Sequence, residues 1–320
     1  YLGQAFILFD RRSGLPENLI WDFAMFQDQF LLATSQSLDL VKISEDNKNV
    51  RVIKRFSLND EEPRKILFKH QGELVYVITA EKNIWYGSID NGFEKILELN
   101  EVAMAVEEVN GEIWVGTTKG IFKVSKGKLL EQYTEDTGLG GDKVNGIYYS
   151  KVRNETWITV LGGPCTLYKD GRFKKYGLEA GLTSSVIQDA AFDKKGYPWF
   201  ATYDDGVIYF NGNEFKNLSE KVSLSSTTTF AIEIDENESV WIGHNWGLDL
   251  YRIPFEDVSR FGKDQGFMGM EVNSGAIHSD GNKNIVMCTL MGLLRFTPSS
   301  FRTNIIEPIT IIKSIRVGDK

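Results

Sequence analysis

The sequence has few of the residues from which metal sites, disulfides and most hydrolytic centres are built. It contains 2 cysteines and 3 histidines in 320 residues, and no paired-cysteine or His-x-x-x-His spacing indicates a zinc site. No G-x-S-x-G segment marks a serine nucleophile. Cys165 and Cys288 fall in distant parts of the repeat described below, so we expect two small buried side chains rather than a disulfide. The sequence therefore predicts no metal and no cofactor.

Long apolar runs and clusters of positive charge are also missing. No segment approaches the roughly 18 apolar residues of a membrane-spanning helix, and the apolar stretch 305–315 contains Glu307, Pro308 and Lys313. The net charge is −8, whereas nucleic-acid binding requires clustered Lys and Arg, so we expect no nucleic-acid partner. No signal peptide is visible. We expect an excised or mature domain.

What the sequence does contain is a repeat of roughly 43 residues. Its clearest copies are 113–124, 198–210 and 240–251. Each copy has a short apolar strand, a polar turn that usually contains Gly, and a second alternating strand, which is the pattern of a β-hairpin. A further strand precedes each hairpin and another follows it. One anchor position marks each of the seven units: Leu31, Tyr76, Trp114, Trp157, Trp199, Trp241 and Val286.

Four short strands per unit describe a blade of a β-propeller. One blade cannot bury its faces alone, so the repeat predicts a single ring rather than several domains. We predict an all-β, seven-bladed β-propeller of four-stranded antiparallel blades over residues 1–301. The last unit ends after its third strand, 293–298, and the N-terminal segment 5–10 supplies the missing one. The ring is thus expected to be closed by the N-terminal strand, which removes an exposed sheet edge.

A second motif, GLP-x-N, precedes the W-I-G-T-x-x-G-L-x-x-Y/F segment of the units and is clearest in 181–210 and 266–301. This combination resembles the two-component-regulator propeller repeat of the periplasmic sensor region of hybrid two-component histidine kinases from gut Bacteroidetes. The resemblance implies a periplasmic domain that precedes an immunoglobulin-like domain, a membrane helix and a kinase. Residues 302–320 are then expected to be a linker and the first strand of that following domain.

The predicted ligand site lies in loops that share one face of the ring. In a four-stranded blade, the loop between blades and the loop between the second and third strands emerge together around the channel mouth, where a ligand would bind. His244, Asn245 and Trp246 depart most from the repeat in these loops. An indole can stack on a sugar ring while imidazole and amide groups hydrogen-bond its hydroxyls. The structural alternative is that Trp246 packs on a neighbouring blade and His244 caps a turn.

Three further residues complete the predicted site. Tyr203 and Asp204 form a polar-aromatic turn one blade earlier, for which a solvated loop is the alternative. Asn273 lies in the expected interblade loop 270–275, where it could equally bond its own backbone. Trp21 follows the first GLP-x-N loop. We expect Trp21 to be buried in the first blade, with a place at the channel mouth as the alternative.

Three functions from different classes fit these residues. The leading hypothesis is an extracytoplasmic ligand-sensing propeller that binds a glycan-derived oligosaccharide. It would signal to a kinase outside this chain through the geometry of a homodimer, formed by the propeller or the following domain. The alternatives are a carbohydrate-active lyase or hydrolase, and a dimerisation or protein-interaction scaffold without its own small-molecule site. We expect no enzyme, because glycoside hydrolysis needs two carboxylates at a set separation, and the sequence brings no such pair together from Asp204, Asp205 and Glu271.

Overall fold

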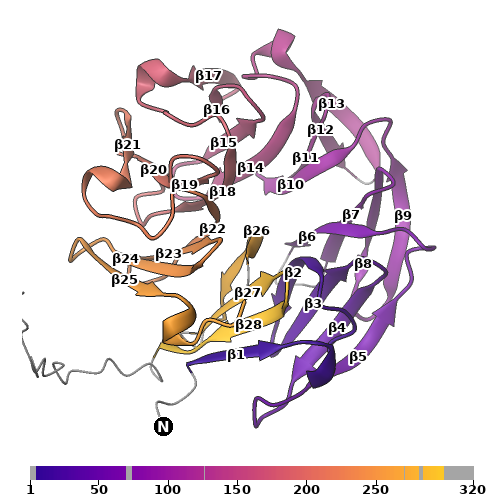
Figure 1. Ribbon diagram of the computed structural model, residues 1–320. Coiled ribbons are helices and arrows are strands. Elements are labelled where there is room, and N and C mark those ends of the chain that lie inside the picture. Colours follow the sequence, from indigo (N-terminus) through magenta and orange to yellow (C-terminus); the bar gives the residue numbers. More distant parts are fainter. Residues whose placement is uncertain (1–4, 70–73, 126, 270, 281–283, 299–320) are drawn as a thin grey trace, which may run out of the picture.

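The computed structural model describes residues 5–69, 74–125, 127–269, 271–280 and 284–298. These residues form seven four-stranded antiparallel sheets arranged as a ring (Figure 1). The prediction of a seven-bladed propeller is therefore confirmed. The expected first strand of a following domain, in residues 302–320, lies outside the described residues.

Six blades take their four strands consecutively from the chain, with the first strand nearest the channel. Blade 1 has β2 (Ile20–Phe26), β3 (Gln29–Thr34), β4 (Leu38–Ile43) and β5 (Val50–Phe56). Blade 2 has β6 (Pro63–Lys69), β7 (Leu74–Thr79), β8 (Asn83–Ser88) and β9 (Gly92–Glu98). Blade 3 has β10 (Ala103–Val109), β11 (Glu112–Thr117), β12 (Gly120–Ser125) and β13 (Lys128–Tyr133).

The second half of the ring follows the same order. Blade 4 has β14 (Val144–Ser150), β15 (Glu155–Val160), β16 (Cys165–Lys169) and β17 (Arg172–Tyr176). Blade 5 has β18 (Ile187–Phe192), β19 (Pro198–Thr202), β20 (Val207–Phe210) and β21 (Phe215–Asn217). Blade 6 has β22 (Thr229–Ile234), β23 (Ser239–His244), β24 (Gly247–Arg252) and β25 (Asp257–Phe261).

Blade 7 joins the two ends of the chain. It contains β26 (Val272–Ser279), β27 (Ile285–Thr289) and β28 (Gly292–Phe296), and its outermost strand is β1 (Phe6–Phe9). The two outer strands pair from Phe6 with Phe296 to Phe9 with Leu293. The Phe6 and Phe296 rings stack with their centres 4.4 Å apart. This pairing confirms that the N-terminal strand closes the ring.

The core consists of seven apolar clusters, one between each pair of neighbouring blades. The predicted anchors all lie on the second strands of their blades, and six of them are buried in these clusters: Leu31, Trp114, Trp157, Trp199, Trp241 and Val286. Tyr76 is half-buried. Cys165 and Cys288 are free and buried, as expected for small apolar residues. The repeat thus encodes the contacts that hold one blade to the next.

The GLP-x-N motif also has a structural role. In four blades its glycine follows a single 3₁₀ turn that leaves the outermost strand: η1 (Arg11–Ser13), η3 (Glu135–Thr137), η4 (Leu178–Ala180) and η6 (Lys263–Gln265). A fifth turn, η5 (Leu218–Glu220), ends without glycine. At Gly181 φ is +82°, and an added Cβ would lie 2.4 Å from the Phe215 carbonyl oxygen. Only glycine fits there, and the following Leu182 is buried.

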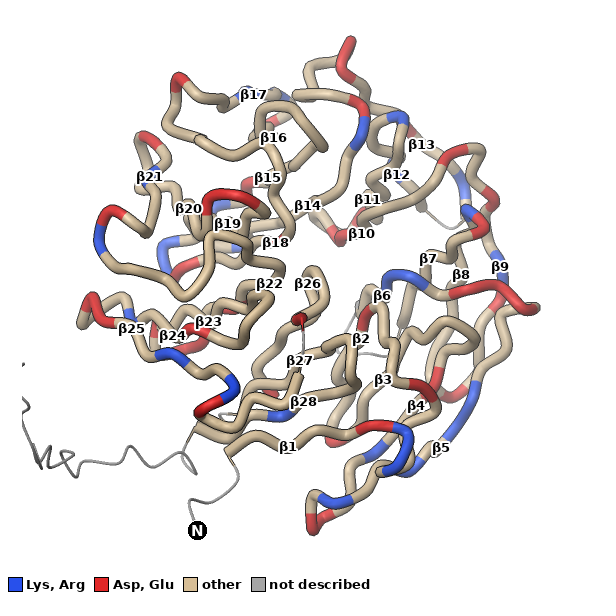
Figure 2. Tube along the Cα trace, viewed as in Figure 1, with Lys and Arg blue, Asp and Glu red and all other residues tan. Residues whose placement is uncertain are grey.

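Charged residues are spread over the outside of the ring. Lys and Arg alternate with Asp and Glu around its edge, and no sector is dominated by one sign (Figure 2). Within the described ranges, no helix has the length and apolar character needed to cross a bilayer.

Candidate functional site

Each inner strand has a break in its pairing with the second strand, at the same place in all seven blades. In blades 1 to 6 the register skips one residue, for example Trp21 between Ile20 and Asp22. In blade 7 the irregular stretch is longer and runs from Val272 to Ile277. A β-bulge re-aims the side chain of its extra residue. In blade 7, Ser274 and Gly275 of this stretch line the channel mouth. In all seven blades the first residue of the break lines it: Trp21, Arg64, Met104, Asn145, Gln188, Phe230 and Asn273.

These seven side chains surround a cavity of about 1080 Å³. Its rim is formed by residues of the connecting loops, including Val102, Leu161, Glu271 and Leu290. Deeper in the channel the walls continue along the inner strands to Glu107, Tyr148 and His278. Small-molecule sites in proteins typically have volumes of about 300–1,000 Å³, so the channel mouth is large enough for an extended ligand.

Polar side chains of the inner strands join neighbouring blades. Asn145 Nδ2 donates to the Ile187 carbonyl at 2.6 Å, and Asn273 Nδ2 donates to the Ile20 carbonyl at 2.6 Å. Both bonds connect a bulged asparagine to the first residue of the next inner strand. One step deeper, Asp22 accepts from the Ile66 backbone N–H at 2.9 Å. These bonds fix the wall of the cavity and leave Asn273 Oδ1 without a role in the contact to blade 1.

The irregular start of β26 reaches across the channel. Figure 1 shows β26 projecting into the centre of the ring. The Ser274 hydroxyl lies 3.0 Å from the Gln188 carbonyl oxygen and 3.1 Å from Gln188 Oε1, both in blade 5. A Cβ on Gly275 would lie 3.5 Å from Lys65 Nζ and 3.6 Å from Asp189 Oδ1. Blade 7 therefore contacts blade 5 through this strand, and Asn273, Ser274 and Gly275 of β26 line part of the cavity.

Two aromatic groups stand at the mouth. Trp21 Nε1 donates to Glu62 Oε1 at 2.7 Å, and the Arg64 guanidinium lies 3.9 Å from the centre of the indole ring. On the other side of blade 7, the Phe230 ring meets the Tyr203 ring edge to face at 6.3 Å. Trp21 is half-buried and lines the cavity. The expectation that it is buried in the first blade was wrong, because the bulge turns its side chain toward the channel.

Ionisable groups occupy the channel below the bulged residues. Burial raises the pKa of Glu107 to about 8 and the pKa of Asp189 to about 7. Burial raises the pKa of Glu233 on β22 to about 7 as well. For His278, burial lowers the pKa below its usual value. Glu107 is consequently mostly protonated at neutral pH, and His278 is neutral, so the deep channel offers hydrogen-bond donors and acceptors with little charge.

His244 accepts the same turn hydrogen bond that a threonine accepts in other blades. The backbone N–H of Trp246 donates to His244 Nδ1 at 3.1 Å, as Lys119 N–H donates to Thr117 Oγ1 at 3.0 Å. His244 is only 2 % exposed, and its Nε2 lies 3.5 Å from a carboxylate oxygen of the buried Asp249. Its side chain caps the turn rather than facing the channel.

Of the five remaining predicted residues, two lie at or beside the cavity and three do not. Asn273 lines the cavity, although it lies in β26 and not in the interblade loop that was expected. Tyr203 packs against the cavity residue Phe230. Asp204 accepts from the Ser184 hydroxyl at 2.5 Å. Asn245 has a buried Oδ1, and Trp246 is 69 % exposed; neither is among the residues around the cavity.

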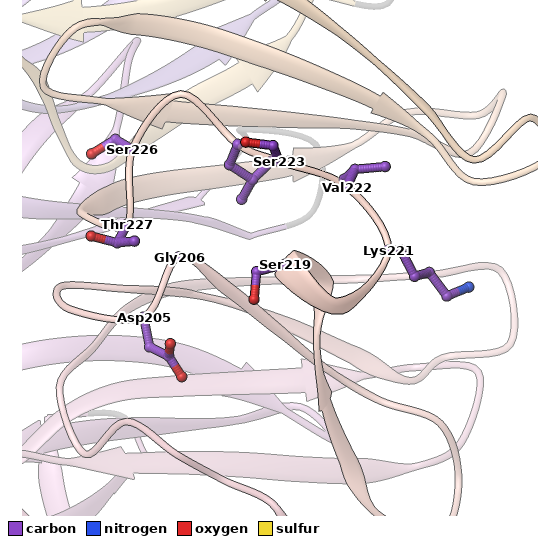
Figure 3. Close-up of a pocket in the computed structure, with 9 residues that line it drawn as sticks. Asp205, Gly206, Ser219, Lys221, Val222, Ser223, Ser226 and Thr227 are labelled. Atoms are coloured by element: carbon purple, nitrogen blue, oxygen red, sulfur yellow. The ribbon is translucent and has the colours of Figure 1, made fainter.

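A smaller hollow of about 320 Å³ lies between blades 5 and 6 (Figure 3). Its walls are mostly small and hydroxyl-bearing, with Ser219, Ser226 and Thr227 among them, while Lys221 extends away from the other side chains. Nothing in this hollow combines an aromatic surface with convergent polar groups. Among the described residues, moreover, no three His, Cys, Asp or Glu side chains gather closely enough to hold a metal ion.

Several solved structures have the same fold as this chain. The extracellular domain of a protein described as a hybrid two-component system of B. thetaiotaomicron is 22% identical, with a TM-score of 0.80 over 92% of this chain and 41% of that one. The extracellular domain of a one-component system from the same organism is 14% identical, with a TM-score of 0.73 over 94% of this chain and 43% of that one.

A catalytically inactive virginiamycin B lyase from Staphylococcus aureus, solved with quinupristin, is 11% identical, with a TM-score of 0.72 over 91% of this chain and 98% of that one. What is shared is the propeller. The chain spans about two fifths of the length of the two extracellular domains. No protein-family model and no curated protein matches the sequence. Because both extracellular domains and a lyase have this fold, the fold alone does not assign the activity.

Sequence reasoning missed five of the seven bulged residues: Arg64, Met104, Asn145, Gln188 and Phe230. A signal for them was present. Each occupies the same position in its unit, directly after the first residue of the inner strand, as in VNG (144–146) and IQD (187–189). In strict strand alternation this position would face a neighbouring blade. Only the bulge turns it into the channel.

Proposed function

We propose that this chain is an extracytoplasmic ligand-sensing propeller that binds a glycan-derived oligosaccharide at the mouth of its central channel without cleaving it. The observation that carries the proposal is the cavity itself, since the bulged residues that the seven blades contribute to its wall are of six different types. Aromatic faces at Trp21 and Phe230 suit the apolar face of a sugar ring, and amide groups at Gln188 and Asn273 suit its hydroxyls.

The likeness to two bacterial extracellular domains supports a receptor role and a periplasmic location. In such a receptor the bound sugar would bias the geometry of a homodimer and so report to a kinase outside this chain. Of the residues predicted from sequence, Asn273 lines the cavity and would contact the ligand, and Tyr203 would act through its contact with Phe230. Asp204, His244 and Asn245 would act by shaping the surrounding turns, and Trp246 would contact only a ligand that extends beyond the cavity.

The test is a calorimetric screen of the purified chain against neutral and acidic di- to hexasaccharides, followed by chromatography of the incubated sugars. We expect saturable binding with unchanged sugars. Phe230→Ala should weaken that binding. The control is Phe255→Ala in the same blade, because Phe255 is 74 % exposed and lies in the turn between β24 and β25. Detection of cleaved products would favour a carbohydrate-active enzyme over the sensor. Absence of binding across the panel would favour the scaffold.

A further inference from the structure

One corner of the channel mouth holds an indole in a fixed orientation. The two oxygens of Glu62 are shared between neighbouring members of the bulged ring: Oε1 accepts from Trp21 Nε1 at 2.7 Å, and Oε2 accepts from Arg64 Nη2 at 2.8 Å. The guanidinium of Arg64 then lies against the indole, 3.9 Å from its centre. A cation–π contact and two charge-assisted hydrogen bonds thus hold a tryptophan that blade 1 supplies and blade 2 supports.

The surroundings of Trp21 differ from those of the core tryptophans. Trp114, Trp157 and Trp199 are buried with no hydrogen-bond partner for Nε1. Trp85 and Trp241 do donate Nε1 to carboxylates, of Glu61 and Asp235, but these two rings are also buried in apolar clusters. Trp21 belongs to none of the seven apolar clusters, yet its polar edge is bonded and one of its faces is covered. Fixing a large side chain costs conformational entropy. For Trp21 the Glu62 hydrogen bond and the Arg64 contact offset this cost, outside the core and beside a cavity. Because Trp21 is half-exposed and lines the cavity, its ring offers apolar surface to a ligand there.

The charge of the cavity limits what that ligand can be. The described walls carry four carboxyl groups, Asp22, Glu107, Asp189 and Glu271, against two cationic groups, Arg64 and Lys65. The charge of Arg64 is already balanced by Glu62 at 2.8 Å. Even with Glu107 protonated, no net positive charge remains to attract a carboxylate or sulfate group. A neutral ligand meets no such penalty.

Hydrogen-bonding groups lie near the indole. Asn273 Nδ2 is bonded to the carbonyl of Ile20, the residue before Trp21, and the Oδ1 of the same amide can accept a hydrogen bond. Arg64 has five N–H donors, of which Glu62 accepts one in the bond described above. A flat apolar face with amide and guanidinium groups nearby matches a pyranose, which has an apolar face and a rim of hydroxyls.

We propose that Trp21 is the stacking platform for a neutral pyranose at the channel mouth, and that Glu62 and Arg64 are positioning residues that hold the indole ready. This inference rests on the proposed function. It assigns the sugar contact to Trp21 rather than to the exposed Trp246, and it names the ligand class as uncharged oligosaccharide.

The experiment uses 5-fluorotryptophan protein and ¹⁹F NMR, with Trp21→Phe and Trp246→Phe spectra to assign the two resonances. The probes are cellotetraose, xylotetraose, mannotetraose and β-1,4-galactotetraose, with tetragalacturonate as the acidic counterpart, each also measured by calorimetry. We expect a neutral probe to shift the Trp21 resonance and leave that of Trp246 in place. Trp21→Ala should weaken binding about 3- to 10-fold, and Trp246→Ala should not.

Glu62 provides a test of the positioning role. Glu62→Ala should broaden or shift the Trp21 resonance in the absence of sugar and weaken binding, while Glu62→Gln, which keeps an acceptor for Nε1, should restore most of both. A purely structural Glu62 would lower the melting temperature without moving the Trp21 resonance.

The outcomes separate the two proposals. Binding of a neutral probe with an unmoved Trp21 resonance overturns the platform and leaves the sensor. Preference for tetragalacturonate overturns the neutral ligand class. Failure of every probe to bind at 10 mM removes the sugar-sensing function and this inference together.

Discussion

Two rings of side chains differ in how uniform their residue types are from blade to blade. The anchor ring lies on the second strands, and the bulged ring lies on the bulges of the inner strands. The anchor ring uses the same kind of residue in most blades, and six of its seven members are buried between blades. The bulged ring has seven side chains of six residue types, all facing one cavity. Where the contact is the same in every blade, one residue type suffices. Where seven blades surround a single asymmetric ligand, each position has its own task.

The largest effect should follow from opening the ring that the anchors stabilise. Deletion of residues 1–10 removes β1 and leaves β28 as an exposed edge, with Phe296 and its neighbours uncovered. We expect loss of soluble monomeric protein, measured by size-exclusion chromatography and circular dichroism. Arg12→Ala, at a side chain 88% exposed, is the control. A truncated chain that melts cooperatively at the wild-type temperature would show that closure does not depend on β1.

A single anchor should matter less than closure and more than any bulged residue. Trp157 is fully buried, with four aromatic rings around it. Trp157→Ala should lower the free energy of unfolding by about 3–5 kcal/mol, measured by urea denaturation. A loss below 1 kcal/mol would mean that the anchor is not what joins blades 4 and 5.

Glu107 lies between the anchor ring and the channel. It lines the cavity, and on the neighbouring strand the anchor Trp114 is its direct pairing partner. Its pKa is raised from 4.5 to about 8 by burial. Because the folded state holds this proton more tightly than the unfolded state, the stability it contributes is complete below about pH 4.5 and is lost as the pH rises through 8. Glu107→Gln should flatten the fall in unfolding free energy across this window. Melting curves from pH 4 to 9 check it, and an unchanged slope would contradict the assignment.

The smallest effect on stability is expected within the bulged ring. Met104 lines the cavity and is half-buried. Met104→Ala should cost less than about 1 kcal/mol of unfolding free energy and change sugar affinity instead. Denaturation and calorimetry on one preparation separate the two quantities. Should Met104→Ala destabilise the chain as much as Trp157→Ala, the division between a stabilising ring and a binding ring would fail.

The sequence predicted the ring, the seven anchors and the strand that closes it, because these features follow from period, alternation and burial. It did not predict which side chains reach the channel. A one-residue bulge reverses the side on which every following residue points, and nothing in the composition of IWD (20–22) or TFA (229–231) announces it. The bulge is stabilised by contacts with the next blade, such as the bond from Asn145 to Ile187, which exist only once both blades have folded.

His244 shows the opposite difficulty. It attracted attention because it breaks the repeat, with histidine where other turns have threonine. Yet imidazole Nδ1 and a threonine hydroxyl oxygen are both acceptors of similar reach, and His244 accepts the same turn N–H that Thr289 accepts in blade 7. A change of residue type was not a change of role. Trp21 carried less sequence signal and lies at the cavity.

The pairing of β1 with β28 also means that the ring can close only late in synthesis. Phe6 must wait for Phe296, about 290 residues later, before either strand has its partner. At translation rates of about 5–20 residues per second that interval is roughly 15–60 s. During it, the apolar face of β1 and the open edge of the growing sheet stack have no cover. Six blades can form in order as the chain emerges, but the ring closes only after β28 has been made, so the propeller is most exposed to aggregation just before that point.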